Sequence, residues 1–169
     1  MQIWVDADAC PGPVKEIVVR AALRLGIRTL FVSDKYVHLE KSALLSYVAV
    51  EQGQDSADKH IVAASLAGDL AVTQDIPLAA LLCRQGVAVI DPRGVVHTPN
   101  TVGDRLATRN LMTDLREAGM ITGGPAPFGA KDRQRFSDSL DRELTRLRKQ
   151  AALRTTRPPT GENRDGEGT

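Results

Sequence analysis

The stretch Gln2-Ile3-Trp4-Val5-Asp6-Ala7-Asp8-Ala9-Cys10-Pro11 decides the fold, because a short apolar run ends there in two aspartates and a helical pattern follows. Over residues 14–25 the apolar side chains recur at helical spacing, and Gly26 ends the pattern. Pro11 and Pro13 fit the entry to this helix, since proline lacks the amide that a first turn leaves unpaired. A buried strand followed by an amphipathic helix is the opening unit of a parallel α/β sheet.

The same alternation of apolar runs and helical patterns continues to about residue 98. Further strands are expected at residues 29–32, 45–50, 70–73 and 87–90. Helices are expected from residue 55 or 56 to 68, from about 78 to 86, from about 102 to 118, and from about 131 to 150. Residues 122–129 hold two glycines before two prolines and predict a loop. This order predicts an α/β protein, a three-layer α/β/α sandwich with a mostly parallel sheet.

Bulk properties predict one globular domain. The 169 residues suit a single domain over residues 1–150, followed by a tail over 151–169 that is first basic, then rich in Gly and Pro, and expected to be disordered. No apolar stretch approaches the roughly 20 residues that cross a bilayer. The N-terminus lacks a signal-peptide pattern, so no membrane partner and a cytoplasmic location are expected. Two cysteines without a Cys-x-x-Cys pair and three scattered histidines predict neither a disulfide framework nor a zinc site.

Aspartates follow two of the expected strands. Asp6 and Asp8 come directly after the first apolar run, and Asp75 follows the run at residues 70–73. The carboxyl ends of strands in an open parallel sheet are where such folds bind ligands. Because neighbouring carboxylates repel one another unless they share a proton or a cation, we expect a hard divalent metal such as Mg²⁺ to bind there. Metal-bound carboxylates in turn indicate phosphate chemistry.

Five motifs in order carry a family resemblance. They are Asp6-Ala7-Asp8-Ala9-Cys10-Pro11, Asp55-x-x-Asp58, Thr73-x-Asp75-Ile76-Pro77-Leu78-Ala79, Pro92-Arg93-Gly94 and Thr122-Gly123-Gly124-Pro125. With these motifs the chain resembles the YaiI/YqxD family of bacterial proteins over roughly residues 1–148. The family is biochemically uncharacterised and is placed in the PIN-like, NYN-related superfamily, so the resemblance implies a PIN-like fold.

Many PIN-like proteins are metal-dependent ribonucleases, and the resemblance therefore implies a site as well as a fold. Its pattern of acids implies catalytic and metal-binding roles for Asp6, Asp8, Asp58 and Asp75. The mid-chain acid of the pattern falls on Asp58 or Asp55, and Asp91 is the best counterpart of a further acid typical of PIN nucleases. Asp55 and Thr73 are expected to orient these groups without binding the metal themselves. The implied cofactor is Mg²⁺ or Mn²⁺, and the implied substrate is RNA or another phosphodiester.

Simpler interpretations of the same residues remain open. Aspartate is a favoured helix N-cap, and Asp8, Asp55 and Asp75 all precede helical patterns, while Asp58 has the spacing of a capping box with Asp55. Asp6 and Asp8 also have the spacing of a haloacid-dehalogenase-like phosphatase, with Asp6 as nucleophile, but no suitably placed lysine follows. Cys10 fits a small packing residue better than a nucleophile, because no histidine can be assigned beside it.

Basic residues provide a second indication of a polyanionic partner. Residues 131–157 contain nine Lys or Arg and four acids, although the net charge of the whole chain is only +1. Arg93, Arg109, Lys131 and Arg133 are the candidates for phosphate contacts, although a solvated helix face accounts for the basic run almost as well. The aromatic content of 4% argues against sequence-specific single-strand recognition. A catalytically inactive nucleic-acid or protein-binding module and a small-molecule phosphohydrolase are the alternative functions.

Overall fold

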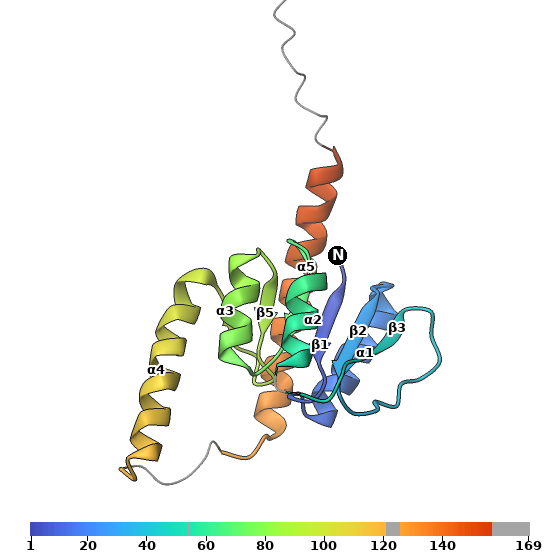
Figure 1. The fold of residues 1–169 in the computed structure, drawn as a ribbon. Coiled ribbons are helices and arrows are strands. Elements are labelled where there is room, and N and C mark those ends of the chain that lie inside the picture. The colour runs from blue at the N-terminus through green and yellow to red at the C-terminus, as the bar shows by residue number, and fades with distance from the viewer. Residues whose placement is uncertain (54, 121–125, 157–169) are drawn as a thin grey trace, which may run out of the picture.

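The computed structural model describes residues 1–53, 55–120 and 126–156, the side chains of 155 and 156 excepted. Six strands form one sheet in the order β3-β2-β1-β4-β5-β6 (Figure 1). Their bounds are β1 Ile3–Asp6, β2 Thr29–Ser33, β3 Leu45–Ala49, β4 Leu70–Val72, β5 Ala88–Ile90 and β6 Val96–His97. Every pairing is parallel except that of β5 with β6. The predicted mostly parallel sheet is confirmed.

The helices cover both faces of this sheet and make the predicted three-layer α/β/α sandwich. Their bounds in the described part of the chain are α1 Gly12–Leu25, α2 Ser56–Ala64, α3 Ile76–Arg84, α4 Pro99–Glu117 and α5 Ala130–Thr156. One apolar core lies between the sheet and the pair α1 and α5. A second core lies between the opposite face and the pair α2 and α3, with one residue from α4, Val102. None of the described helices is long and apolar enough to cross a membrane.

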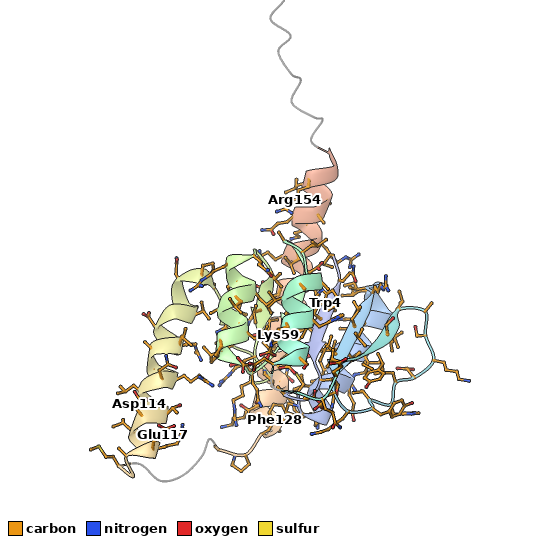
Figure 2. All side chains as sticks on the ribbon, viewed as in Figure 1. Trp4, Lys59, Asp114, Glu117, Phe128 and Arg154 are labelled. Atoms are coloured by element: carbon orange, nitrogen blue, oxygen red, sulfur yellow. The ribbon has the colours of Figure 1, made fainter. Side chains whose placement is uncertain are left out.

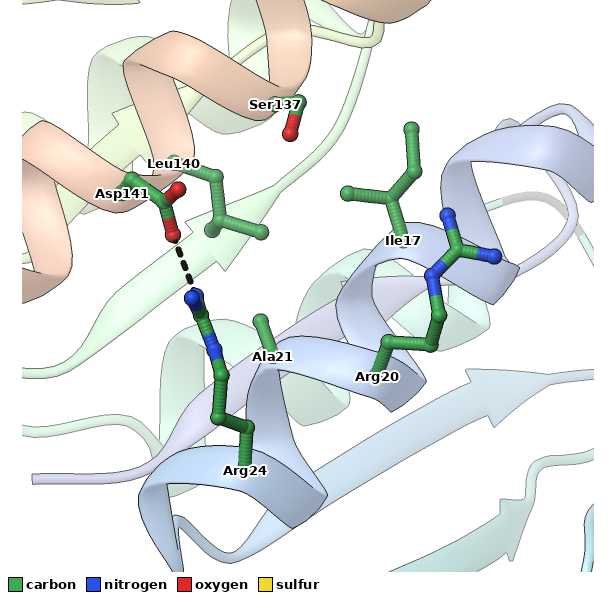
Figure 3. A pocket seen from close by; sticks show the side chains of 7 residues that line it. All are labelled: Ile17, Arg20, Ala21, Arg24, Ser137, Leu140 and Asp141. Carbon is green, nitrogen blue, oxygen red and sulfur yellow. Dashed lines mark hydrogen bonds and ion pairs between the residues drawn. The ribbon is translucent and has the colours of Figure 1, made fainter.

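Helices α1 and α5 pack side by side, as Figure 3 shows. The Arg24 guanidinium donates to the Asp141 carboxylate at 2.6 Å across this contact. Both side chains are more than half exposed, so the ion pair contributes at most about 1 kcal/mol. Buried apolar residues on both helices supply most of the stabilisation, including Val14 and Ile17 from α1 and Leu140 from α5.

The outermost helix, α4, packs on α3 and has a single buried residue, Val102. Asp114 and Glu117 lie near its distal end, away from the sheet (Figure 2). Its start is fixed by Thr98 and Thr101, which form a capping box, so α4 begins at Pro99 rather than at residue 102 as expected. The sequence pattern missed this start because the first turn of α4 has no apolar stripe.

Other elements also differ from expectation. Strand β6 was not expected, since two residues are too short to show a periodic pattern. Helix α2 ends at Ala64 instead of residue 68, and the chain turns so that Leu66 N donates to Asp69. Helix α5 continues through Thr156, past the expected boundary at residue 150, where alanines keep helix propensity high. Of the expected loop at 122–129, residues 122–125 lie outside the described chain, as does the tail from residue 157.

Candidate functional site

The strand order locates a crevice between β1 and β4. The chain places β2 and β3 on one side of β1, then crosses to place β4 and β5 on the other side. The connections after β1 and β4 therefore diverge at the carboxyl edge, and open α/β sheets bind ligands at such a switch point. Asp6 is the last residue of β1, and Asp75 immediately precedes α3. The expected convergence of these two strand ends is confirmed by the pairing of β1 with β4.

Asp6 is buried at this edge, with 5% of its surface exposed. Its Oδ2 accepts a hydrogen bond of 2.7 Å from Thr73 Oγ1, and the Ala9 amide also bonds to its carboxylate. Burial raises the pKa of Asp6, and the nearby charges of Asp8 and Asp75 raise it further, while the two hydrogen bonds oppose this shift. Asp6 is thus a carboxylate for which a nearby cation would be strongly favourable.

Thr73 links Asp6 to Asp75. Its hydroxyl donates to Asp6 and accepts a hydrogen bond of 3.0 Å from Asp75 N. Asp75 Oδ1 accepts from Leu78 N at 2.9 Å, so the expected capping role of Asp75 is confirmed. Its Oδ2 forms no hydrogen bond with any described residue. One oxygen of Asp75 therefore holds the helix start, and the other is available to a ligand.

Asp58 enters the same environment from the first turn of α2. Burial raises its pKa to about 6, with further contributions from the charges of Asp75, Asp6 and Asp55 in that order. Asp58 and Asp75 also line one pocket together, so the two carboxylates face the same space. We call Asp6, Asp58 and Asp75 the carboxylate cluster.

Asp55 and Asp8 do not cap helices. Asp55 stands at the N-cap of α2 with a positive φ of 64°, and its side chain forms no capping hydrogen bond, so the expected capping box with Asp58 is wrong. Asp8 accepts hydrogen bonds from Ser33 Oγ at 2.6 Å and Asp34 N at 3.0 Å, which ties the end of β1 to the end of β2. The expected capping role of Asp8 is also wrong, because α1 begins later, with Pro11 as its N-cap.

A pocket of about 410 Å³ opens beside the carboxylate cluster. Its lining includes Asp55, Asp58 and Asp75 on one side, together with Lys59, which is labelled on α2 in Figure 2, and Arg109 from α4. The Arg109 side chain forms no ion pair or hydrogen bond within the described residues. The pocket thus combines acids with two cations, as a site for a metal ion and a phosphate would.

The described residues contain no group of three or more His, Cys, Asp or Glu side chains already gathered around one point that could hold a metal ion. Asp6 is held by its hydrogen bond with Thr73, and Asp75 is held partly by its capping hydrogen bond with Leu78 N. Mg²⁺ usually takes one or two carboxylates directly and keeps several waters. Asp75 Oδ2 and the Asp58 carboxylate are the oxygens that remain available for such a contact.

The other expected phosphate contacts are placed differently. The Arg93 guanidinium donates to Asp132 at 3.1 Å and to the Ala126 carbonyl, and thereby ties the turn after β5 to the start of α5. Lys131 and Arg133 are exposed on the first turns of α5 and line none of the pockets described here. Of the four candidates, Arg109 alone is brought into the pocket beside the acids.

Two residues of the site were not identified from the sequence, Lys59 in the pocket and Ser33, which holds Asp8. Lys59 follows Asp58 directly, and that adjacency could have indicated it. Ser33 ends β2 and was hidden within a strand pattern. Cys10 is buried and donates to the Val72 carbonyl, and burial raises the pKa of its thiol, which fits the expected packing role.

Replacing Asp58 by Asn should stabilise the metal-free protein at neutral pH. The folded-state pKa of about 6 exceeds the ordinary value of 3.8, so folding favours the protonated carboxyl and stability falls as pH rises between these values. Allowing for solvent screening, the gain should be on the order of 1 kcal/mol, or a rise in Tm of about 2–4 °C. Thermal melts at neutral pH and at a pH below the ordinary carboxyl pKa should show the gain only at neutral pH.

The matched control is Asp114→Asn, at an exposed position on α4. Its melting temperature should follow that of the wild-type chain at both pH values. Equal melting of Asp58→Asn and wild type at neutral pH would contradict the raised pKa of Asp58 that burial and the neighbouring acids produce.

Comparison with other proteins gives one family. A family model described as "Uncharacterized BCR, YaiI/YqxD family" matches residues 4–146. A UPF0178 protein of Myxococcus xanthus is 56% identical over 147 residues, which cover 87% of this chain and 96% of that protein. A UPF0178 protein of Pseudomonas aeruginosa is 45% identical over 158 residues, covering 94% of this chain and 99% of that protein. No solved structure matches. The resemblance carried by the motifs is confirmed, and the chain belongs to the YaiI/YqxD family.

Proposed function

We propose that this chain is a divalent-metal-dependent nuclease that hydrolyses RNA phosphodiester bonds at the carboxylate cluster. The observation that carries the proposal is that Thr73 joins Asp6 and Asp75 at the switch point of the sheet, while Asp58 lines the same pocket as Asp75. The PIN-like fold that the motif resemblance implies would support the same reaction class.

The chemistry of the carboxylate cluster fits Mg²⁺ or Mn²⁺. Carboxylate oxygens are the ligands that these hard cations prefer, and burial among like charges makes a cation favourable at Asp6 and Asp58. When bound, the metal would polarise a phosphate oxygen and position a water for attack. Asp75, through its free oxygen, and Asp58 would hold the metal directly. Asp6 would not bind the metal itself but would act on the site through Thr73 and water.

The remaining groups of the pocket supply the other requirements of hydrolysis. Burial raises the pKa of Asp58 to about 6 in the metal-free protein, and Asp58 would lose its proton when it binds the metal. Arg109 and Lys59 line the same pocket and would bind the negative phosphate oxygens. Thr73 holds Asp6 and the Asp75 backbone in fixed positions, which limits reorganisation during the reaction.

Cleavage assays with metal and with chelator test the proposal. Labelled single-stranded RNA and a generic aryl phosphodiester should be hydrolysed in Mg²⁺ or Mn²⁺ and not in chelator. Arg109→Ala should lower kcat/KM for RNA by about 10- to 100-fold, because it removes a charged hydrogen bond to phosphate. Arg116→Ala, at an exposed position on the same helix, is the control and should leave kcat/KM unchanged.

Each alternative function has its own outcome in these assays. RNA binding without cleavage in any metal would favour an inactive binding module. Hydrolysis of a small phosphomonoester alone would favour a phosphohydrolase. Cleavage that persists in chelator would contradict the metal-dependent mechanism itself.

A further inference from the structure

A second pocket lies beside α1, on the α1 face of the sheet. It has a volume of about 560 Å³ and lies between α1 and the loop that follows β2. We call it the Tyr36 groove, after its main lining residue; it is also lined by Lys15, Val19, Arg20, Val37 and Leu39. Val19, Val37 and Leu39 also pack against the core, so the groove has an apolar base.

Tyr36 is an exposed aromatic side chain in a fixed orientation. It is 79% exposed, and its ring contacts the ring of Tyr47 edge to face, with centroids 5.8 Å apart. These are the only two tyrosines in the 169-residue sequence. An edge-to-face contact orients the first ring while leaving its outer face free. A free aromatic face in a mixed apolar and polar groove is typical of base stacking.

Hydrogen bonds link the Tyr36 groove to the segment that follows β1. Lys15, which lines the groove, donates to the carbonyl of Ala7, the residue between Asp6 and Asp8. Ser33 and the Asp34 amide hold Asp8 at the point where the loop to Tyr36 begins. The groove is therefore attached to the same segment that carries Asp6 and Asp8.

Charges in the Tyr36 groove suit a nucleotide in which the base makes the main contact. Lys15 and Arg20 can meet phosphates, and in Figure 3 the Arg20 guanidinium turns away from Asp141, which pairs with Arg24 instead. Arg20 forms no ion pair within the described part of the chain. Glu16 and Glu40 also line the groove, so its net charge is low and phosphate attraction alone would be weak.

We propose that the Tyr36 groove binds a nucleobase of single-stranded RNA by stacking it on Tyr36, with Lys15 and Arg20 contacting the flanking phosphates. This inference rests on the proposed nuclease function, because the RNA strand bound in the groove would be the one cleaved at the carboxylate cluster. The groove selects unpaired bases, since a base held in a duplex cannot present its face to the ring.

Binding measured in chelator tests the groove without cleavage. Fluorescence anisotropy with labelled oligouridylate should show that Tyr36→Ala weakens binding by about 5- to 150-fold. Tyr36→Phe should bind as the wild type does, because stacking needs the ring and not the hydroxyl. Leu66→Ala is the matched control, because this side chain is 69% exposed and precedes β4, at the amino ends of the strands. An abasic oligonucleotide should bind wild type and Tyr36→Ala equally.

Several results would contradict the proposal that the Tyr36 groove binds a nucleobase. They are wild-type affinity in Tyr36→Ala, equal loss of affinity for the abasic strand, and no binding of oligouridylate by the wild type. Photo-crosslinking with a 5-iodouridine oligonucleotide provides a second measurement and should modify Tyr36. If RNA binding depended on Tyr36 but no cleavage occurred in Mg²⁺, the proposed nuclease function would be wrong and the proposed nucleobase binding would still hold.

Discussion

Asp6→Asn should lower metal-dependent RNA cleavage by about 100-fold, because the substitution removes a negative charge next to the proposed metal site. Asparagine has nearly the same shape as aspartate and keeps an oxygen that can accept the hydrogen bond from Thr73 Oγ1. The loss should therefore come from charge and not from geometry. Steady-state cleavage of labelled RNA over a range of Mg²⁺ concentrations measures it, and added metal should not restore the wild-type rate.

Stability separates this effect from misfolding. Burial and neighbouring acids raise the pKa of Asp6, so its charged form is unfavourable in the metal-free fold, and the variant should melt no lower than the wild type at neutral pH. Asp114→Asn, on the exposed part of α4, is the control for a lost negative charge and should keep full activity. Wild-type cleavage by Asp6→Asn would remove Asp6 from the mechanism.

The sequence alone predicted the sheet well because its strands are short apolar runs that end at turn residues. β1 carried both the strand and the acid at its end, and Asp6 lies on the strand as expected. The alternation of strands and helices predicts a mostly parallel sheet, and β1 and β4 are parallel neighbours in it. The position of the candidate site is thus a consequence of topology.

The partners of individual side chains were less predictable. Aspartate before a helix has the same local pattern whether it caps the helix, as Asp75 does, or bonds to another strand, as Asp8 does. The choice depends on Ser33, which is distant in sequence and adjacent in space. Arg93 similarly pairs with Asp132, which local sequence could not indicate. Position along the chain therefore predicts where acids gather and not which of them remain free.

Helix α5 should be essential to the stability of the domain, and Phe136→Ala should cost about 3–5 kcal/mol. Phe136 is fully buried in the core that α5 shares with α1 and β1. Its replacement leaves a cavity that the rigid sheet cannot close. Urea unfolding followed by the fluorescence of the only tryptophan, buried Trp4, measures the loss.

Lys149→Ala is the matched control, at an exposed position on the same helix, and should change stability by less than about 0.5 kcal/mol. Helix α5 also contacts the turn after β5, at the carboxyl edge of the sheet where the candidate site lies, so unfolding of α5 should affect function too. A Cβ on Gly94, whose φ is +81°, would lie 2.6 Å from the Arg135 carbonyl, and Ser139 Oγ donates to the Gly94 carbonyl at 2.8 Å. The turn after β5 is therefore packed directly on α5. If Phe136→Ala unfolded within about 1 kcal/mol of the wild type, α5 would be an appendage, and the domain that supports the carboxylate cluster would end before it.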